Sequence, residues 1–405
     1  MAVAESQAET LSIEALDDWI IAQGLESSSL NDFVEGLAPR LNAAGLSIRR
    51  LHISRSALDP SLEGTGCTWT RSEGIHAEGY AHGNTDTQRW HESPLKAMID
   101  RRIMKMRRRL VGPEAQLDYP VLTEFRDAGG TEWIAYLIEF TPGDNPTALL
   151  GLSLTLLGDA PEGFTTAQEA ALDRLAQRIG LVVFRLTLAQ TLYNVIRAYI
   201  GLHAGWRIVQ GRIKRGDVDR LTAAILFADL RGFTRFAETN PPDQVIAGLN
   251  DYLGATVEAI DARDGQVLKF LGDGLLAVFD LEGREETEVC GAALEAAREA
   301  LAANANLNET RAAAGLPALG LGIGLHLGEV LYGNVGSAER LDFTVIGPAV
   351  NQTSRIESLC GELGVGLLIS ERFAKASARP LRDLGTHSLR GVATPQRLYT
   401  LGDEV

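Results

Sequence analysis

Two aspartates near glycine-containing turns place the strongest constraint on how this chain can fold. Asp229 lies near the start of segment 227–234, and Asp273 lies 44 positions later, between two glycines. Each follows a short apolar run of strand-like composition, at 223–227 and 267–271. Two strands that end side by side would bring both carboxylates together, and paired carboxylates can hold hard divalent cations against a polyphosphate. The sequence therefore predicts two-metal phosphoryl chemistry.

Length and composition set broad limits on the rest. The 405 residues are enough for two or three domains, and the formal charge of −15 argues against a nucleic-acid surface. Three cysteines without CxxC spacing argue against a disulfide framework or a zinc site. The polar start lacks a signal peptide and no apolar run approaches membrane-spanning length. We therefore expect no membrane span and a cytoplasmic protein.

Residues 1–160 have the pattern of a small mixed α/β sensor domain. Its expected elements are helices at 13–23 and 30–44 and strands at 47–54, 133–140 and 148–157. Segment 95–110 has apolar residues at helical spacing opposite basic ones, which predicts a further helix with a solvated basic face. The alternative is a basic helix that binds acidic partners or a membrane surface.

Residues 161–215 predict a long linker helix. The helix is expected to begin at a capping box from Thr166 to Glu169, and no proline interrupts the pattern before Pro241. Its apolar positions follow a heptad, which favours a two-stranded coiled coil and hence a homodimer. Further apolar residues outside the seam indicate partial burial against a domain. The seam residues are Leu172, Leu175, Ile179, Val182, Leu186, Ala189, Tyr193, Ile196 and Ile200.

Residues 216–405 alternate between strands and helices, which predicts an α+β sandwich with helices on a mostly antiparallel sheet. Glycines alternate with apolar residues in 319–327, indicating a strand face packed closely under a helix. His326 in this run is expected to be structural. The expected strands are 221–227, 266–271, 274–279, 319–327, 329–335 and 396–401, and the expected helices are 242–262, 286–305 and 349–362.

Four segments of this region, in order, carry a resemblance to a known family. They are 227–234, 268–274, 324–330 and 344–355. Over residues 221–401 the chain resembles the catalytic domain of class III nucleotidyl cyclases. The resemblance implies a dimer with catalytic sites at the subunit interface, and the conversion of a nucleoside triphosphate into a cyclic nucleotide and pyrophosphate.

The resemblance also implies a metal site for two Mg²⁺ or Mn²⁺ ions. Asp229 and Asp273 match the metal-holding carboxylates, and the backbone carbonyl of Leu230 matches a third ligand. The physical need is clear, because the 3′-hydroxyl must lose a proton and the departing pyrophosphate must be neutralised. Taken singly, Asp229 could instead be a helix N-cap and Asp273 a hairpin turn residue.

Other matched residues bear on the phosphates and the ribose. Asn351 and Arg355 are four apart on a predicted helix, so their side chains point the same way. Asn351 matches a ribose-orienting asparagine, and Arg355 matches an arginine that stabilises charge on the α-phosphorus. Arg390 matches a basic residue that reaches the terminal phosphates, and Arg340 is a weaker candidate for that role.

Base choice follows from hydrogen-bond chemistry. Lys269 and Thr344 match the family's purine-reading pair, in which an ammonium donates to adenine N1 and a hydroxyl accepts from the exocyclic amine. Guanine presents the opposite pattern there, so the pair favours ATP. Thr344 stands where many members have aspartate, and the threonine-bearing subgroup is associated with bicarbonate responsiveness.

The sequence thus predicts a homodimeric adenylate cyclase that makes 3′,5′-cyclic AMP. The order of elements in 1–160 resembles a GAF-type sensor domain, whose signal no residue set identifies. One alternative is a guanylate cyclase, which Lys269 opposes. The other is a catalytically silent nucleotide-binding regulatory protein, which the retention of the whole residue set opposes.

Overall fold

The protein consists of two compact units, Met1–Val195 and Ile196–Val405. A computed structural model describes residues 11–27, 29–83, 87–140, 151–337 and 339–402. The acidic N-terminal segment and the start of the strand expected at 148–157 lie outside these residues.

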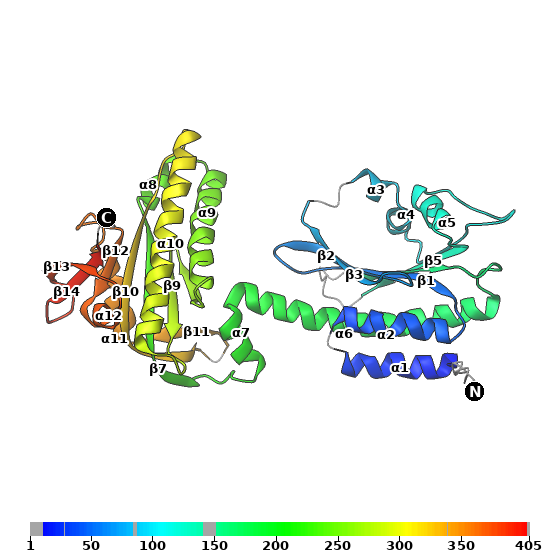
Figure 1. Cartoon of the computed structure of the whole chain (residues 1–405), viewed down its shortest axis with the longest axis horizontal. Coiled ribbons are helices and arrows are strands. Elements are labelled where there is room, and N and C mark those ends of the chain that lie inside the picture. Colours follow the sequence, from blue (N-terminus) through cyan, green and yellow to red (C-terminus); the bar gives the residue numbers. More distant parts are fainter. Residues whose placement is uncertain (1–10, 28, 84–86, 141–150, 338, 403–405) are drawn as a thin grey trace, which may run out of the picture. The chain divides into compact units, whose positions relative to one another are not determined.

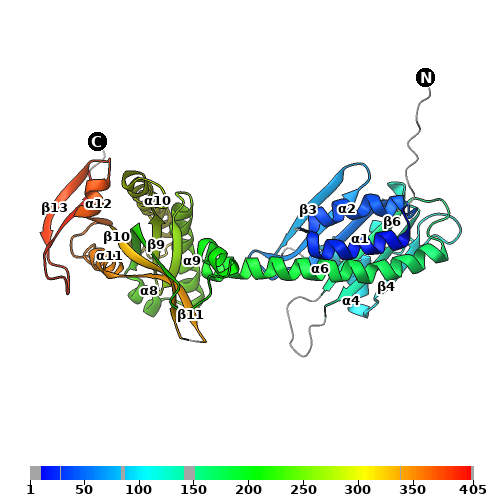
Figure 2. The ribbon, with the colours of Figure 1, turned by 90° about the horizontal axis from the view of Figure 1, so that it is seen from below.

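The N-terminal unit is built on a six-stranded antiparallel sheet in the order β3-β2-β1-β6-β5-β4. Helices α1, α2 and α6 cover one face, and α3, α4 and α5 lie against the other (Figures 1 and 2). The strands are β1 Ile48–Ser56, β2 Leu62–Thr70, β3 Gly74–Ala81, β4 Lys105–Arg109, β5 Glu132–Glu139 and β6 Gly151–Gly158. The helices are α1 Ile13–Glu26, α2 Leu30–Ala43, α3 Gln88–His91, α4 Pro94–Arg101, α5 Pro120–Asp127 and α6 Thr166–Ile200.

The helix predicted across 95–110 is wrong. Helix α4 ends at Arg101, Arg102 adopts a left-handed conformation, and the basic residues that follow form the edge strand β4. The apolar spacing misled because Met98, Met106 and Leu110 are indeed buried together, but in a core between α4, α5 and the sheet. A helix and the strand that follows it can thus contribute side chains to the same buried cluster.

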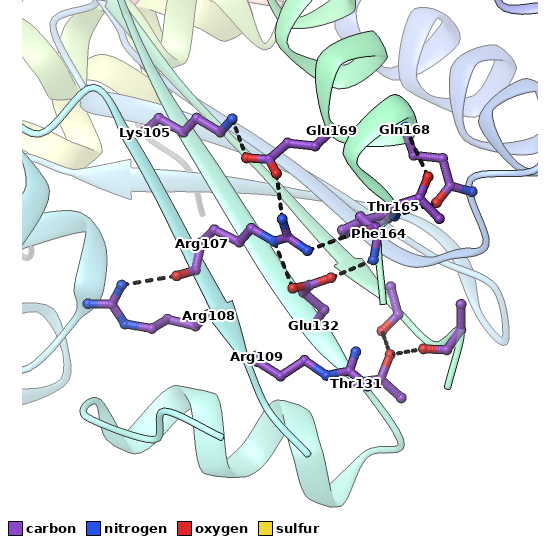
Figure 3. Close-up of polar contacts among 12 residues, drawn as sticks. Lys105, Arg107, Arg108, Arg109, Thr131, Glu132, Phe164, Thr165, Gln168 and Glu169 are labelled. Carbon is purple, nitrogen blue, oxygen red and sulfur yellow. Dashed lines mark hydrogen bonds and ion pairs between the residues drawn. The ribbon is translucent and has the colours of Figure 1, made fainter. Parts of the chain in front are cut away.

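The basic residues of β4 fasten the sheet to the start of α6 (Figure 3). Arg107 donates to the Glu132 carboxylate (2.7 Å), to Glu169 (2.5 Å) and to the Phe164 carbonyl (2.8 Å). Lys105 pairs with Glu169 at 2.6 Å and with Asp173 at 2.6 Å. Glu132, which is 2% exposed, also accepts from the Phe164 N–H. Lys105, Arg107, Glu132 and Glu169 are therefore each paired with an opposite charge.

The capping box lies one residue earlier than predicted. The Thr165 hydroxyl accepts from the Gln168 N–H at 3.2 Å, and the Gln168 side chain accepts from the Thr165 N–H at 2.9 Å. Glu169 is occupied by Lys105 and Arg107 instead. The pattern at 166–169 was mistaken because Thr165 and Thr166 are adjacent and each is followed three residues later by Gln168 or Glu169.

The predicted coiled-coil seam is largely occupied by the chain's own core. Leu172, Leu175, Ile179, Val182 and Leu186 are buried against the N-terminal sheet. A one-sided apolar helix produces the same spacing whether it meets a second helix or a sheet. Tyr193 of the predicted seam is exposed. The other exposed large apolar residues of α6 lie outside the seam, at heptad-like spacing: Leu181, Leu188, Leu192 and Tyr199.

Helix α6 also corrects the expectation that no apolar run approaches membrane-spanning length. Its most apolar 18-residue window has a mean hydropathy of 1.5, so by length and composition alone it could cross a bilayer. A third of that window is buried in the structure, and core helices pass the same test.

The C-terminal unit is built on an eight-stranded sheet in the order β13-β14-β12-β10-β7-β9-β8, with β11 paired to β10. Among the described strands, β10 and β12 form the parallel pair and the other pairs are antiparallel. The strands are β7 Val218–Arg231, β8 Gln266–Leu271, β9 Gly274–Asp280, β10 Gly320–Gly336, β11 Leu341–Ile346, β12 Leu367–Ser370, β13 Leu381–His387 and β14 Gln396–Leu401. The helices are α7 Leu202–Val209, α8 Phe233–Thr239, α9 Pro242–Asp261, α10 Glu286–Ala313, α11 Pro348–Ser358 and α12 Glu371–Ala376.

Helices lie on both faces of this sheet, which confirms the α+β class. Helices α9 and α10 lie side by side on one face and form the larger core (Figure 1). Helices α7 and α11 pack on the other face, around a smaller core that includes Ile225 and Leu276. His326 is buried and bonds Ser370 at 2.8 Å, as expected of a structural residue.

The glycine alternation in β10 does mark close helix packing. A Cβ on Gly324 would lie 2.7 Å from the Thr353 carbonyl of α11, and one on Gly328 would lie 2.5 Å from the Ala349 side chain. The two strands expected at 319–327 and 329–335 are a single strand, because Gly328 serves this contact and not a turn. Strands β11, β12 and β13 were not predicted.

We predict that Glu132→Ala destabilises the N-terminal unit by about 3 kcal/mol. The substitution removes the carboxylate from a buried ion pair and leaves the Phe164 N–H without its acceptor. Denaturant unfolding of the full chain, followed through the transition of this unit, measures the loss. The exposed Glu162→Ala is the matched control, and equal midpoints for the two variants would contradict the prediction.

Candidate active site

The structure brings Asp229 and Asp273 together at the end of the β7–β9 pairing. Strand β7 pairs with β9 up to Ala228 and Leu275, so Asp229 is the next residue beyond and Asp273 lies in the turn before β9. A Cβ on Gly274 would lie 2.7 Å from Asp229 Oδ1, so glycine leaves room for the carboxylate against the turn. The neighbouring Leu230 N–H bonds the Asp229 carboxylate.

The electrostatics of this acidic pair are those of a site that lacks a counter-charge. Burial, followed by repulsion from Asp273, raises the pKa of Asp229 to about 6, although the Leu230 N–H opposes the change. A bound cation would reverse both effects. Among the described residues no cluster of three or more histidine, cysteine or acidic side chains is placed to hold a metal, so this pair and backbone carbonyls are the fitting donors.

Glu357 of α11 is a third carboxylate that the sequence analysis missed. It is 7% exposed, and burial, followed by repulsion from Asp229, raises its pKa to about 7. Arg231, at the end of β7, lies close enough to oppose this shift, and both side chains lie over Gly322, where a Cβ would clash with Glu357. The signal was available: a glutamate two residues after Arg355 falls on the face of α11 that packs against glycine-bearing β10.

Asn351 and Arg355 line one pocket, together with Pro348, Gln352 and the segment at Gly391. Gly391 has a left-handed conformation. A Cβ placed on it would lie 3.5 Å from the Arg355 guanidinium, so this turn is close to Arg355. Arg390, next in sequence, is exposed at the same turn. Arg340 lies apart from them, exposed in the turn between β10 and β11.

Lys269 and Thr344 belong to a different group of residues. Lys269 of β8 pairs with Asp342 of β11 at 2.5 Å. Thr344, two residues after Asp342, is 5% exposed, and its buried hydroxyl has no hydrogen-bond partner in the described part of the chain. No ion pair or hydrogen bond among those residues joins Lys269 to either aspartate of the acidic pair.

The candidate site therefore has three parts: an acidic pair whose oxygens suit divalent cations, a pocket lined by Asn351 and Arg355 whose guanidinium suits a phosphate, and Lys269 with Thr344, whose hydroxyl is unsatisfied. Comparison with known proteins agrees with this chemistry. Residues 218–378 match the family described as the adenylate and guanylate cyclase catalytic domain. This segment is a class III cyclase catalytic domain.

Two curated relatives with a named activity are adenylate cyclases. An adenylate cyclase of Anabaena cylindrica is 38% identical over 172 residues, which are 42% of this chain and 33% of that protein. Adenylate cyclase 1 of Rhizobium meliloti is 32% identical over 186 residues, 44% and 27% of the respective chains. The chain thus spans about a third or less of the length of these curated relatives.

A solved structure of the guanylyl cyclase Cya2 is also similar to this cyclase domain. It is 32% identical, with a TM-score of 0.41, over 46% of this chain and 95% of that one. The family that residues 218–378 match includes both adenylate and guanylate cyclases, so the substrate is a separate question from the family.

Glu357→Gln should change how stability depends on pH in metal-free protein. Because the folded-state pKa of Glu357 is raised, its contribution to stability is full below the unfolded value near 4.5 and is lost as pH rises through about 7. The wild type should lose about 2 kcal/mol more than Glu357→Gln between pH 5 and pH 8. Chemical unfolding in the presence of a chelator measures this. The exposed Glu362→Gln should follow the wild type, and a Glu357→Gln profile parallel to both would refute the assignment.

Proposed function

We propose that the protein is an adenylate cyclase, which converts ATP into 3′,5′-cyclic AMP and pyrophosphate. The observation that carries the proposal is the convergence of Asp229 and Asp273, whose mutual repulsion calls for cations. It is supported by the arginine pocket at Asn351 and Arg355, and by the adenylate cyclases among the relatives.

The acidic pair would hold two Mg²⁺ or Mn²⁺ ions, with help from the Leu230 carbonyl. Bound there, such ions would lower the pKa of the 3′-hydroxyl and neutralise the leaving pyrophosphate. Asn351 would orient the ribose so that the 3′-oxygen faces the α-phosphorus. Arg355 would donate to the α-phosphate oxygens, where negative charge grows during attack. Arg390, and less directly Arg340, would bind the terminal phosphates.

Base selection would fall to Lys269 and Thr344, with ATP as the preferred substrate. The buried Thr344 hydroxyl lacks a partner, and the exocyclic amine of adenine is a donor that would satisfy it. A guanylate cyclase is the enzymatic alternative. A catalytically silent nucleotide-binding protein is the other, and the repulsive acidic pair speaks against it, because a protein without turnover gains nothing from that cost.

We further propose a cytoplasmic homodimer whose sites lie between two catalytic domains and whose output is set by the N-terminal domain. That domain is GAF-like in our proposal, with a small-molecule or protein signal of unknown identity. Because of Thr344, we also propose that the protein belongs to the bicarbonate-responsive type of subgroup. The exposed face of α6 at Leu181, Leu188 and Leu192 is the surface we assign to dimer contact, in place of the buried seam.

One assay tests the central proposal. Purified full-length protein is incubated with ATP or GTP and with Mg²⁺ or Mn²⁺, and the products are identified by mass. Cyclic AMP as the main product supports an adenylate cyclase. Cyclic GMP as the main product supports the enzymatic alternative, and the absence of both cyclic nucleotides would support the silent protein.

Asp229→Asn or Asp273→Asn should reduce turnover of ATP by at least about a thousandfold, since each removes charge that holds cations at the reacting phosphate. The variants should stay folded, because the loss relieves the repulsion between the two carboxylates. Initial rates of cyclic AMP formation give the measurement. The exposed Asp243→Asn serves as the control, and near-normal rates in both folded site variants would rule out the metal assignment.

Mixing two inactive variants should restore activity if sites are shared between subunits. The family resemblance assigns Asp229 and Lys269 of one chain to different sites of the dimer. A heterodimer of Asp229→Ala and Lys269→Ala chains would then have one intact site and one doubly damaged site. We expect activity near one quarter of the wild type, since random exchange makes half the dimers mixed and each has one of two sites. If labelled subunits exchange and the mixture stays inactive, each chain builds its site alone.

A further inference from the structure

Lys269 has one carboxylate partner among the described residues, and that partner lies on a strand to which β8 is not hydrogen-bonded. Strand β8 pairs with β9, and β11 pairs with β10, yet Lys269 Nζ lies 2.5 Å from Asp342 Oδ2. The side chains are 27% and 61% exposed. The ion pair therefore bridges the two strands at the edge of the site, and fixes where the ammonium lies.

Asp342 also shares a face of β11 with Thr344. Alternate residues of a strand point to the same side, so Asp342 and Thr344 share one face of β11. Phe343 and Val345, on the other face, point into the smaller core. The carboxylate that holds Lys269 and the unpartnered hydroxyl of Thr344 are thus presented by one strand on one side. A buried hydroxyl without a partner costs about 1–3 kcal/mol, so this arrangement calls for a donor or acceptor from outside the chain.

A lysine cannot by itself tell adenine from guanine. Its ammonium is a compact point charge on a flexible stem, with three equivalent donors. Adenine N1 and guanine O6 are both acceptors, and lie within one side-chain movement of each other at the same edge of the purine. Selection therefore needs something that restricts the ammonium to one position.

We propose that Asp342 is a positioning residue that gives Lys269 its selectivity for adenine. This inference rests on the proposed cyclase function. One ammonium N–H stays with Asp342, and the other two remain free for the base. Held in this way, the ammonium meets adenine N1 while Thr344 accepts from the adenine amine. The Asp342 carboxylate would also repel the O6 oxygen of guanine, which adds a penalty against the wrong base.

The test compares Asp342→Asn with Asp342→Glu, which keeps the charge, and with Glu339→Gln, which removes a charge from the same turn without touching Lys269. Two quantities are measured for each variant. One is kcat and KM with ATP and with GTP. The other needs no turnover: displacement of a fluorescent mant-ATP by the non-cyclisable analogues α,β-methylene-ATP and α,β-methylene-GTP.

We expect Asp342→Asn to reduce the ATP-to-GTP ratio about fivefold in both measurements, the scale of a partly exposed ion pair. The loss should appear as a higher KM for ATP with kcat changed less than about twofold, because the base lies away from the reacting atoms. Asp342→Glu should recover most of the ratio, and Glu339→Gln should match the wild type.

Two outcomes would overturn the proposal: an unchanged base ratio in Asp342→Asn, or a lower KM for ATP, which would mean that Asp342 competes with the base for Lys269. Failure of the cyclase function is recognised separately, as a wild type that makes no cyclic nucleotide. The displacement ratios still decide the role of Asp342 in that case. The role of Asp342 would be rejected if the wild type bound neither analogue or preferred α,β-methylene-GTP.

Discussion

The repulsion between two half-buried carboxylates is the constraint around which the catalytic unit is arranged. Asp229 and Asp273 are brought together by the antiparallel pairing of β7 with β9, which lies beside the edge strand β8. Sequence-distant strands with strong apolar cores on both faces are needed to impose such an approach. The glycine at 274 allows it sterically, since any Cβ there would contact the Asp229 carboxylate. Part of the folding free energy therefore offsets the repulsion between the two carboxylates, and a bound cation would relieve that repulsion.

The N-terminal unit, by contrast, contains a buried acid whose charge is balanced by partners. Glu132 is more deeply buried than Asp229, yet it accepts from Arg107 and from the Phe164 N–H, and Arg107 is further paired with Glu169. A satisfied network of this kind orients the first turns of α6 on the sheet and has no capacity left for a ligand. The two carboxylates differ in their partners. Glu132 is paired with a cation and stabilises the fold, whereas Asp229, which has no cationic partner among the described residues, is a candidate site.

Much of the catalytic unit could be predicted from sequence because its signals are local. The helices at α9, α10 and α11 and the strands at β7, β8 and β9 have clear periodicity, and the glycine alternation of β10 correctly indicated close helix packing. The failures have a common physical origin. Apolar spacing in 95–110 and in α6 reports that a face is buried but not what buries it, so a strand was taken for helix and a core contact for a dimer seam. Short strands such as β12 carry too few residues to show a period.

Site residues whose role depends on long-range approach were harder to find. Glu357 reaches the acidic pair only because α11 packs on β10, and Asp342 reaches Lys269 only because β11 folds back along β10. Local spacing indicates the face of α11 on which Glu357 lies, but it encodes neither approach. Each lies near a polar group that would gain from a ligand: Glu357 adds repulsion at Asp229, and Asp342 lies two residues before Thr344, whose buried hydroxyl has no partner among the described residues. Because such groups gain free energy when a ligand arrives, the incomplete hydrogen bonds of the unliganded protein define the charge and donor pattern of the ligand it can accept.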